Sequence, residues 1–298
     1  MRWPEPEFPI DDGLVRRLLE DQHPDLAGLA LRPFDAGWDN VMWRLGEDLA
    51  VRIPRRAIAA PLIVHEQRWL PLLAPGLPLA VPAPLRAGVP ASYYPWHWSV
   101  VPWIDGEPGD RAPVRDIGGS ADSLGRFLRV LHRPAPADAP YNPFRSGSIG
   151  SRADTFEERM AKLAPMVDDV ALRRVWDTAL GAPVHAGAAI WLHGDLHPAN
   201  TLVRHGAVVA VIDFGDICAG DPACDVGAAW LTVPPEGMDR FWSVYGPLDP
   251  ALEARSFGWA VLFGLMLLEI GLEGRPTYAE VGRETLDRLA SMASGAVG

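Results

Sequence analysis

The sequence predicts an α+β protein built from two unequal lobes. Strand-like segments gather in the first third of the 298-residue chain, and helical periodicity dominates the remainder. The strands follow one another through short turn sequences, which indicates an antiparallel meander and not the strand–helix alternation of a parallel sheet. A chain of this length also suits two lobes better than one small core. We expect an N-terminal lobe over residues 1–104 and a C-terminal lobe over residues 105–298.

The N-terminal lobe should combine a small sheet with two helices. Residues 11–30 have the spacing of an amphipathic helix, and residues 57–73 form a second helix that Pro71 bends or ends. Residues 74–95 are rich in proline and glycine and carry edge strands at most. A β-prone segment over residues 96–104 closes the lobe. Three further strands, separated by turn sequences, are expected over Leu29–Phe34, Val41–Leu45 and Leu49–Ile53.

The C-terminal lobe begins after the turn sequence Asp105–Gly109 and is mainly helical. Helical spacing covers residues 121–132 and 153–180, and it returns from residue 222 onward. The exception is residues 191–214, where two short strands flank a His-Gly turn.

Composition excludes several classes of function. The formal net charge of −11 disfavours binding to nucleic-acid phosphates and favours cationic partners. The single lysine, Lys162, does not lie in a Gly-Lys-Ser/Thr sequence, so no Walker P-loop is present. The apolar run Ser256–Leu268 has 13 residues, fewer than the roughly 20 that a bilayer requires, and no signal peptide is visible. We therefore expect a cytoplasmic protein that binds no nucleic acid and no membrane.

The densest group of polar residues is His193–Asn200, with the sequence HGDLHPAN, followed by Asp213-Phe-Gly-Asp after an apolar hairpin. A hairpin brings its two ends together, so Asp195, Asn200 and Asp213 could surround one small volume. One carboxylate could take a proton from a hydroxyl, while an amide oxygen and a second carboxylate could hold Mg²⁺. Phosphoryl transfer needs this chemistry, because it depends mainly on positioning and charge neutralisation.

These segments, together with Gly220–Asp225 (GDPACD), resemble the aminoglycoside phosphotransferase family. Its members are small-molecule kinases, and macrolide kinases are close to them. The resemblance implies a protein-kinase-like two-lobe fold: a small N-terminal lobe with an antiparallel sheet plus helix, and a larger helical C-terminal lobe. It extends to Arg52–Arg56 and Glu66–Pro71 in the first lobe and to the helix that ends at His132.

The resemblance assigns roles to individual residues. Asp195 would be the catalytic aspartate, and Asn200 and Asp213 would bind Mg²⁺ on the phosphates of ATP or GTP. His193 would brace the catalytic loop, and Asp225 would hold the loop or cap the following helix.

The resemblance also implies a nucleotide site in the first lobe. Arg52 stands where kinases usually carry a lysine, with Glu66 as its partner, and an arginine can bind phosphate in a bidentate way. The remaining nucleotide contacts would come from a loop between the first two strands and from a hinge: Trp38, Asn40, Val41, Val100, Val101 and Trp103.

The substrate would be a small molecule with a hydroxyl group. An aminoglycoside-type antibiotic fits the acidic chain, and Asp216 and Glu269 are candidates for contacting such a cation. A macrolide or a metabolite alcohol such as choline or a sugar is the alternative acceptor. The residues also leave open a nucleotide-binding pseudokinase and a metal hydrolase built on His193, Asp195, His197 and Asp213. The oligomeric state does not follow from the sequence.

Overall fold

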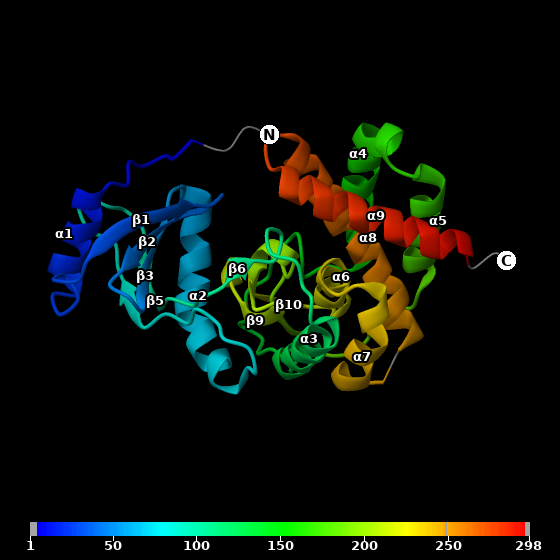
Figure 1. Cartoon of the computed structure of the whole chain (residues 1–298), viewed down its shortest axis with the longest axis horizontal. Coiled ribbons are helices and arrows are strands. Elements are labelled where there is room, and N and C mark those ends of the chain that lie inside the picture. Colours follow the sequence, from blue (N-terminus) through cyan, green and yellow to red (C-terminus); the bar gives the residue numbers. More distant parts are fainter. Residues whose placement is uncertain (1–4, 248, 296–298) are drawn as a thin grey trace. The chain divides into compact units, whose positions relative to one another are not determined.

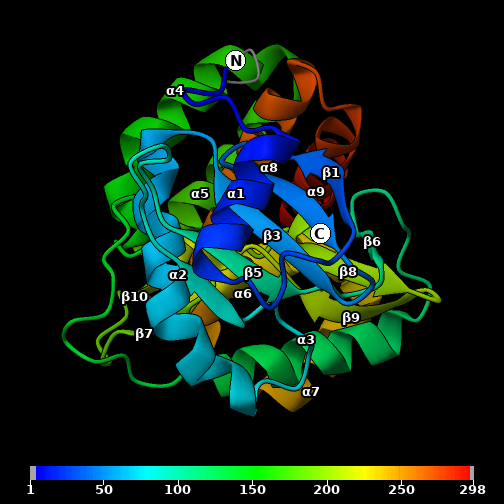
Figure 2. The same ribbon diagram turned by 90° about the vertical axis from the view of Figure 1, so that its left-hand side faces the viewer.

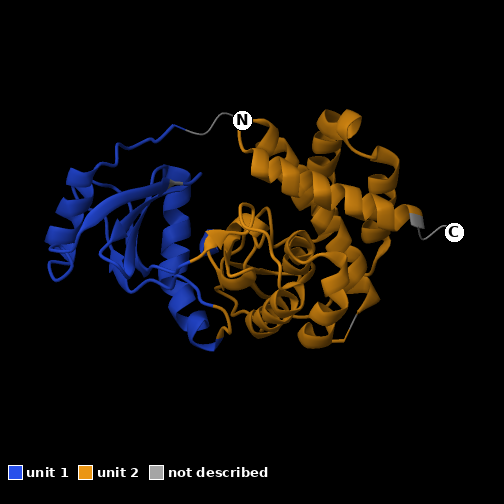
Figure 3. Cartoon of the chain, in the orientation of Figure 1, with its two compact units in different colours: residues 1–76, 80–105, 213–215 blue, residues 77–79, 106–212, 216–298 orange. Residues whose placement is uncertain are grey.

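The computed structural model describes residues 5–247 and 249–295, which form two compact units (Figures 1 and 3). Residues 213–215 belong to the N-terminal unit, although the segments before and after them in the chain belong to the C-terminal unit. The N-terminal unit comprises residues up to Gly76, Ala80–Asp105 and Asp213–Gly215, and the C-terminal unit comprises Leu77–Leu79, Gly106–Ile212 and the chain from Asp216 onward.

The N-terminal unit is an antiparallel five-stranded sheet in the order β1-β2-β3-β5-β4, accompanied by α1 and α2. Its elements in chain order are α1 (Asp12–Gln22), β1 (Leu31–Ala36), β2 (Asn40–Leu45), β3 (Leu49–Pro54), α2 (Ala60–Leu73), β4 (Arg86–Gly88) and β5 (Trp98–Pro102).

The two helices of this unit differ in how a proline affects them. Helix α1 ends at Gln22 and not near residue 30, because His23 precedes Pro24 and a residue before proline is disfavoured in the helical region. Pro71 lies inside α2 without interrupting it, and the helix ends two residues later at Leu73.

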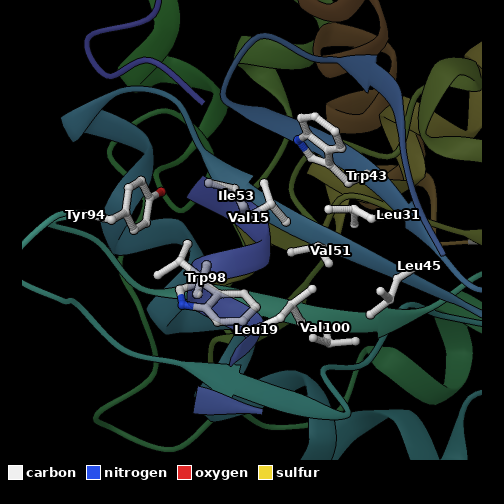
Figure 4. Packing of buried hydrophobic residues seen from close by; sticks show 11 residues of the cluster. Val15, Leu19, Leu31, Trp43, Leu45, Val51, Ile53, Tyr94, Trp98 and Val100 are labelled. Atoms are coloured by element: carbon white, nitrogen blue, oxygen red, sulfur yellow. The ribbon is translucent and has the colours of Figure 1, made fainter. Parts of the chain in front are cut away.

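Helix α1 packs its apolar face on the sheet. Val15, Leu18 and Leu19 are fully buried against strand residues such as Val51 and against the Trp98 ring (Figure 4). Figure 2 shows α1 in front of the sheet. Burying these aliphatic side chains contributes about 1.5–3 kcal/mol each. The helix therefore fixes the sheet that carries Arg52.

The C-terminal unit contains the remaining helices and two small sheets, β10-β7 and β6-β8-β9. Its elements are β6 (Glu107–Pro108), α3 (Ile117–Leu131), α4 (Ala153–Leu163), α5 (Asp169–Gly181), β7 (Ile190–Leu192), β8 (Thr201–Arg204), β9 (Ala207–Val211), β10 (Cys218–Gly220), α6 (Ala223–Thr232), α7 (Pro235–Tyr245), α8 (Pro250–Leu272) and α9 (Pro276–Gly295).

Helix α8 forms the core of this unit and packs against α9, α6 and α5. Its length and composition would suffice to cross a membrane, but 72% of its most apolar stretch is buried inside the protein, as in the core helix of a soluble domain. With an antiparallel sheet in one unit and mainly helices in the other, the predicted α+β class is confirmed.

Candidate active site

The loop His193–Asn200 leaves β7 and is held by a carboxylate from α6. Asp225, which is wholly buried, accepts hydrogen bonds from the backbone N–H of His193 (2.7 Å) and of Gly194 (2.8 Å). His132 Nε2 lies 3.2 Å from the same carboxylate. Burial raises the pKa of Asp225, but the hydrogen bond and charge of His132 outweigh burial and hold that pKa below its ordinary value. Asp225 thus supports the loop from inside the protein.

The histidine and glycine of the HGD sequence shape the turn before Asp195. His193 Nδ1 accepts the backbone N–H of Asp195 at 3.1 Å, while its Nε2 donates to the Ile212 carbonyl at 3.0 Å. Gly194 has φ +86°, and a Cβ there would lie 2.6 Å from the Asp216 carbonyl oxygen. Any other residue would be strained and would clash. This explains why the loop reads His-Gly-Asp and not the His-Arg-Asp of protein kinases.

Three side chains surround the Asp195 carboxylate. Arg145 Nη2 donates to Oδ1 at 2.9 Å, Asn200 Nδ2 donates to Oδ2 at 3.1 Å, and His197 Nε2 lies 3.3 Å from Oδ2. Burial raises the pKa of Asp195, but the charges of His197 and Arg145 outweigh burial and hold it well below its ordinary value. The side chain is 21% exposed. Asp195 is therefore an ionised carboxylate that is partly exposed.

Asn200 is oriented by the same loop. Its Nδ2 also donates to the backbone carbonyl of Asp195 at 2.8 Å, so both contacts of this amide nitrogen are made with Asp195. Its own carbonyl accepts the backbone N–H of Ile212 at 2.9 Å, and Asp213 is the next residue of the chain.

Within the N-terminal unit, Arg52 on β3 is held between two carboxylates. Its Nη2 lies 3.2 Å from Glu66 Oε1 of α2 and donates to Asp213 Oδ1 at 2.5 Å. Arg52 and Glu66 are enclosed, whereas the Asp213 side chain is 49% exposed. Burial lowers the pKa of Arg52, but Asp213 and Glu66 together raise it above its ordinary value. Arg52 is thus a fixed cation beside an exposed carboxylate.

The expected nucleotide loop between β1 and β2 is a tight turn. Gly37 N–H donates to the Asn40 carbonyl at 2.8 Å, and the buried Asn40 Oδ1 has no hydrogen-bond partner among the described residues. Trp38 lies under the Arg56 guanidinium, 5.6 Å from the ring centroid. Val41 is partly buried against the core of the sheet.

The expected hinge residues differ in their surroundings. Val100 and Val101 lie inside β5, pair with Val51 and Ala50 of β3, and have buried side chains. Their backbone groups therefore take part in the sheet. Trp103 follows the strand: its N–H donates to the Asp48 carbonyl at 2.7 Å, and its ring lies under Arg44.

The two expected substrate contacts already have partners in the C-terminal unit. Asp216 Oδ1 accepts from Asn142 Nδ2 at 2.6 Å. Glu269 on α8 accepts from Arg159 Nε at 3.2 Å and from Lys162 Nζ at 2.6 Å, both of α4. Glu269 is thus paired with two cations.

Mg²⁺ prefers oxygen ligands, and two of the expected metal-binding residues carry such atoms. Asn200 presents an amide oxygen and Asp213 an exposed carboxylate. Across residues 5–247 and 249–295, no three or more histidine, cysteine, aspartate or glutamate side chains gather as a metal centre.

Sequence reasoning missed the residues that contact the site from other segments. Arg145 comes from the loop between α3 and α4, His132 from the end of α3, and Arg159 from α4. None lies at a motif spacing from Asp195, so only the packing of the unit identifies them.

An open groove of about 620 Å³ formed by α5, α8 and α9 is lined by none of the expected site residues.

The fold and sequence can be compared with known proteins. A family model for the phosphotransferase enzyme family matches residues 30–261. The GDP complex of aminoglycoside 2'-phosphotransferase-IIIa has a TM-score of 0.70 and 18% identity, covering 95% of this chain and 99% of that one. Macrolide 2'-phosphotransferase MphH from Brachybacterium faecium has a TM-score of 0.60 and 23% identity, covering 93% and 98%. No curated protein sequence matches this chain.

The architecture and the family match define a phosphotransferase with a protein-kinase-like fold. The family model matches well over half of the chain, so the chain belongs to the phosphotransferase enzyme family. The fold and family that the HGDLHPAN and DFGD segments implied are thereby confirmed, while the roles of individual residues stay predictions.

Proposed function

We propose that this chain is an ATP- or GTP-dependent kinase that transfers the γ-phosphoryl group to a hydroxyl of a small molecule. The state of Asp195 carries the proposal. Its carboxylate is ionised, partly exposed, and oriented by Arg145, His197 and Asn200. Such a carboxylate can accept or orient the proton of an attacking hydroxyl.

The phosphate side of the reaction is assigned to Arg52, Asn200 and Asp213. Arg52 would balance phosphate charge, since an arginine is always protonated and binds phosphate oxygens with two N–H groups. Asn200 and Asp213 would hold Mg²⁺, which when bound neutralises negative charge on the triphosphate. The paired Glu66 keeps Arg52 in place on β3.

Similar structures support a nucleotide donor and an antibiotic-type acceptor. One is the GDP and kanamycin complex of APH(2")-IIIa, and another is a ternary complex of APH(2")-IIa with streptomycin and ATP. MphH supports a macrolide as the acceptor. We place the protein in the cytoplasm, where nucleoside triphosphates are available.

A nucleotide-consumption screen tests this function. ATP and GTP are each supplied with Mg²⁺ and a panel of antibiotic and metabolite alcohols, and the Asp195→Asn variant serves as the blank. We expect acceptor-dependent release of ADP or GDP above the blank, and ³¹P NMR then locates the new phosphoester. Tight nucleotide binding without transfer to any alcohol would instead indicate a pseudokinase.

A further inference from the structure

His197 contacts the Asp195 carboxylate from within the same loop, His193–Asn200 (the HGD loop). The imidazole is buried, and its Nε2 lies 3.3 Å from Asp195 Oδ2. The other ring nitrogen, Nδ1, is buried as well and has no hydrogen-bond partner in the described part of the chain. A buried polar atom without a partner lowers stability, so the hydrogen bonds of the ring do not by themselves explain its orientation. The packing around the ring must help to direct Nε2 at Asp195.

Tyr278, in the first turn of α9, supplies such packing. Its ring meets the His197 ring edge to face, with the ring centroids 5.5 Å apart and an angle of 69° between the ring planes. The Arg275 guanidinium carbon lies 5.2 Å from the centroid of the Tyr278 ring. Tyr278 thus contacts a cation of the turn between α8 and α9 as well as the histidine beside Asp195.

A hydrogen bond ties the start of α9 to the segment after β6. Thr277 Oγ1 donates to Asp110 Oδ2 at 2.7 Å. The N–H of the preceding Gly109 donates to the carbonyl of Pro198 at 2.9 Å, and Pro198 follows His197 in the chain. Asp110 Oδ1 is buried and has no hydrogen-bond partner among residues 5–247 and 249–295. Asp110 therefore connects α9 with the HGD loop although one of its oxygens is unsatisfied, which disfavours stability.

Close packing on α8 fixes the first turns of α9. A Cβ on Gly271 of α8 would overlap the backbone of Ala279, and a Cβ on Gly282 of α9 would overlap the backbone of Leu268. The two helix backbones therefore approach each other closely, and packing of this kind leaves little room for movement. Tyr278 also lies beyond residue 261, where the match to the family model ends. The contact of α9 with the HGD loop is thus a feature that the family match does not describe.

We propose that Tyr278 is a positioning residue for the proposed kinase reaction: its ring holds His197 so that Nε2 faces Asp195. Asp195 Oδ2 is then contacted by the imidazole and by the Asn200 amide, and the carboxylate is confined to one orientation. A displacement of about 1 Å at a catalytic group can cost about a hundredfold in rate. The first turn of α9 therefore contributes to turnover through His197. The proposal rests on the kinase function proposed above, in which Asp195 is the base.

Variants of Tyr278 provide the first test, with steady-state kinetics on an acceptor found in the nucleotide-consumption screen. Tyr278→Leu removes the ring and should lower kcat about tenfold, with little change in KM for the nucleotide or the acceptor. Tyr278→Phe keeps the ring and should retain most of kcat. An unchanged kcat in Tyr278→Leu, an equal loss in both variants, or a rise in acceptor KM alone would overturn the proposal.

Leu289→Ala is the matched control for the packing of α9. Leu289 is buried on the same helix, about three turns after Tyr278. The variant should lower the midpoint of thermal unfolding and leave kcat unchanged. A kcat loss as large as that of Tyr278→Leu would mean that any loosening of α9 slows the enzyme, and it would contradict a specific role of the Tyr278 ring.

Variants of His197 test the step between Tyr278 and Asp195. A glutamine amide can donate from about the position of Nε2, so His197→Gln should keep much of kcat, whereas His197→Leu should lower it about 10–100-fold. His197→Leu should change the thermal midpoint little, because Nδ1 loses no hydrogen bond. Adding Tyr278→Leu to His197→Leu should lower kcat no further. An additive loss would mean that Tyr278 does not act through His197, and it would contradict the proposal.

A readout without turnover separates this proposal from the kinase function. In protein labelled with ¹⁵N-histidine, the ring signals of His197 are those missing from the spectrum of His197→Gln. We expect these signals to shift in Tyr278→Leu and to stay in place in Leu289→Ala. Unchanged signals in Tyr278→Leu would overturn the proposal even if the kinase is active. If no acceptor is phosphorylated, the kinase function fails, and the ring signals alone decide whether Tyr278 positions His197.

Discussion

Two aspartates of the C-terminal unit, Asp195 and Asp225, contact the same loop in different ways. Both carboxylates have a pKa below the ordinary value although burial raises it. Asp225 is fully enclosed and binds two backbone N–H groups and a histidine. Asp195 is partly exposed and is contacted by side chains, namely Arg145, His197 and Asn200.

The difference lies in what each carboxylate holds. Asp225 fixes the backbone of His193 and Gly194, so its loss leaves buried N–H groups without partners. The partners of Asp195 are side chains that keep it ionised and oriented at a partly exposed position. We therefore expect changes at Asp195 to act on turnover and changes at Asp225 to act on folding.

The largest expected effect is on turnover. Asp195→Asn keeps the shape and one oxygen acceptor for Arg145, but it removes the proposed base. We expect kcat to fall by about 10²–10⁴-fold, the usual contribution of a positioned general base. Nucleotide affinity and the thermal midpoint should change little. Steady-state kinetics, nucleotide titration and thermal unfolding together check this, and near-normal turnover would disprove the role of Asp195.

The second effect is on stability. Asp225→Ala removes a buried acceptor from two N–H groups and the partner of His132. We expect a loss of about 3–5 kcal/mol in the free energy of unfolding, as is usual when a buried ionic partner is deleted. Denaturant titration measures it. Asp122→Ala is the control, because Asp122 forms a surface pair with Arg240 and should matter little. A similar loss in both variants would contradict the comparison.

Contacts made through local spacing could be predicted from the sequence. Asp195 and Asn200 both lie in the segment HGDLHPAN. They are five positions apart in a tight loop, and this short separation brings their side chains into contact. The strand meander could be predicted because turn residues separate its apolar runs. Arg52 and Glu66 could be paired because a strand residue and a following helix residue matched a known arrangement.

Contacts made through tertiary packing could not be predicted. Arg145 reaches Asp195 from 50 positions away along the chain, out of a loop that has no periodicity and no motif. The packing of α4 on α8 pairs Glu269 with Arg159 and Lys162, which are far from it in the sequence. The direction of a loop and the partner of a helix face depend on the packing of the whole unit, which local sequence patterns do not reveal.

A smaller effect on kinetics is expected in the N-terminal unit, where Arg52 is paired with one buried carboxylate and one exposed carboxylate. Glu66→Gln removes the buried charge and leaves Arg52 paired with Asp213. With its anchor weakened, Arg52 should bind phosphate less well, raising KM for the nucleotide about tenfold, or about 1.4 kcal/mol, with a smaller change in kcat. Initial rates at varied ATP or GTP measure this split. A kcat loss as large as that of Asp195→Asn would mean that the contacts around Arg52 and those around Asp195 do not act separately.

The smallest effect near neutral pH is the contribution of Asp225 to acid stability. Its folded-state pKa is depressed, so its stabilisation is present above the unfolded-state pKa of about 3.9 and is lost as pH falls through the folded-state value. The difference in unfolding free energy between wild type and Asp225→Asn should therefore stay constant from about pH 7 to about pH 5 and shrink below about pH 4. Denaturant titrations across this range check it. A difference that already shrinks between pH 7 and pH 5 would mean that burial, and not the contacts with His132, His193 and Gly194, determines the charge state of Asp225.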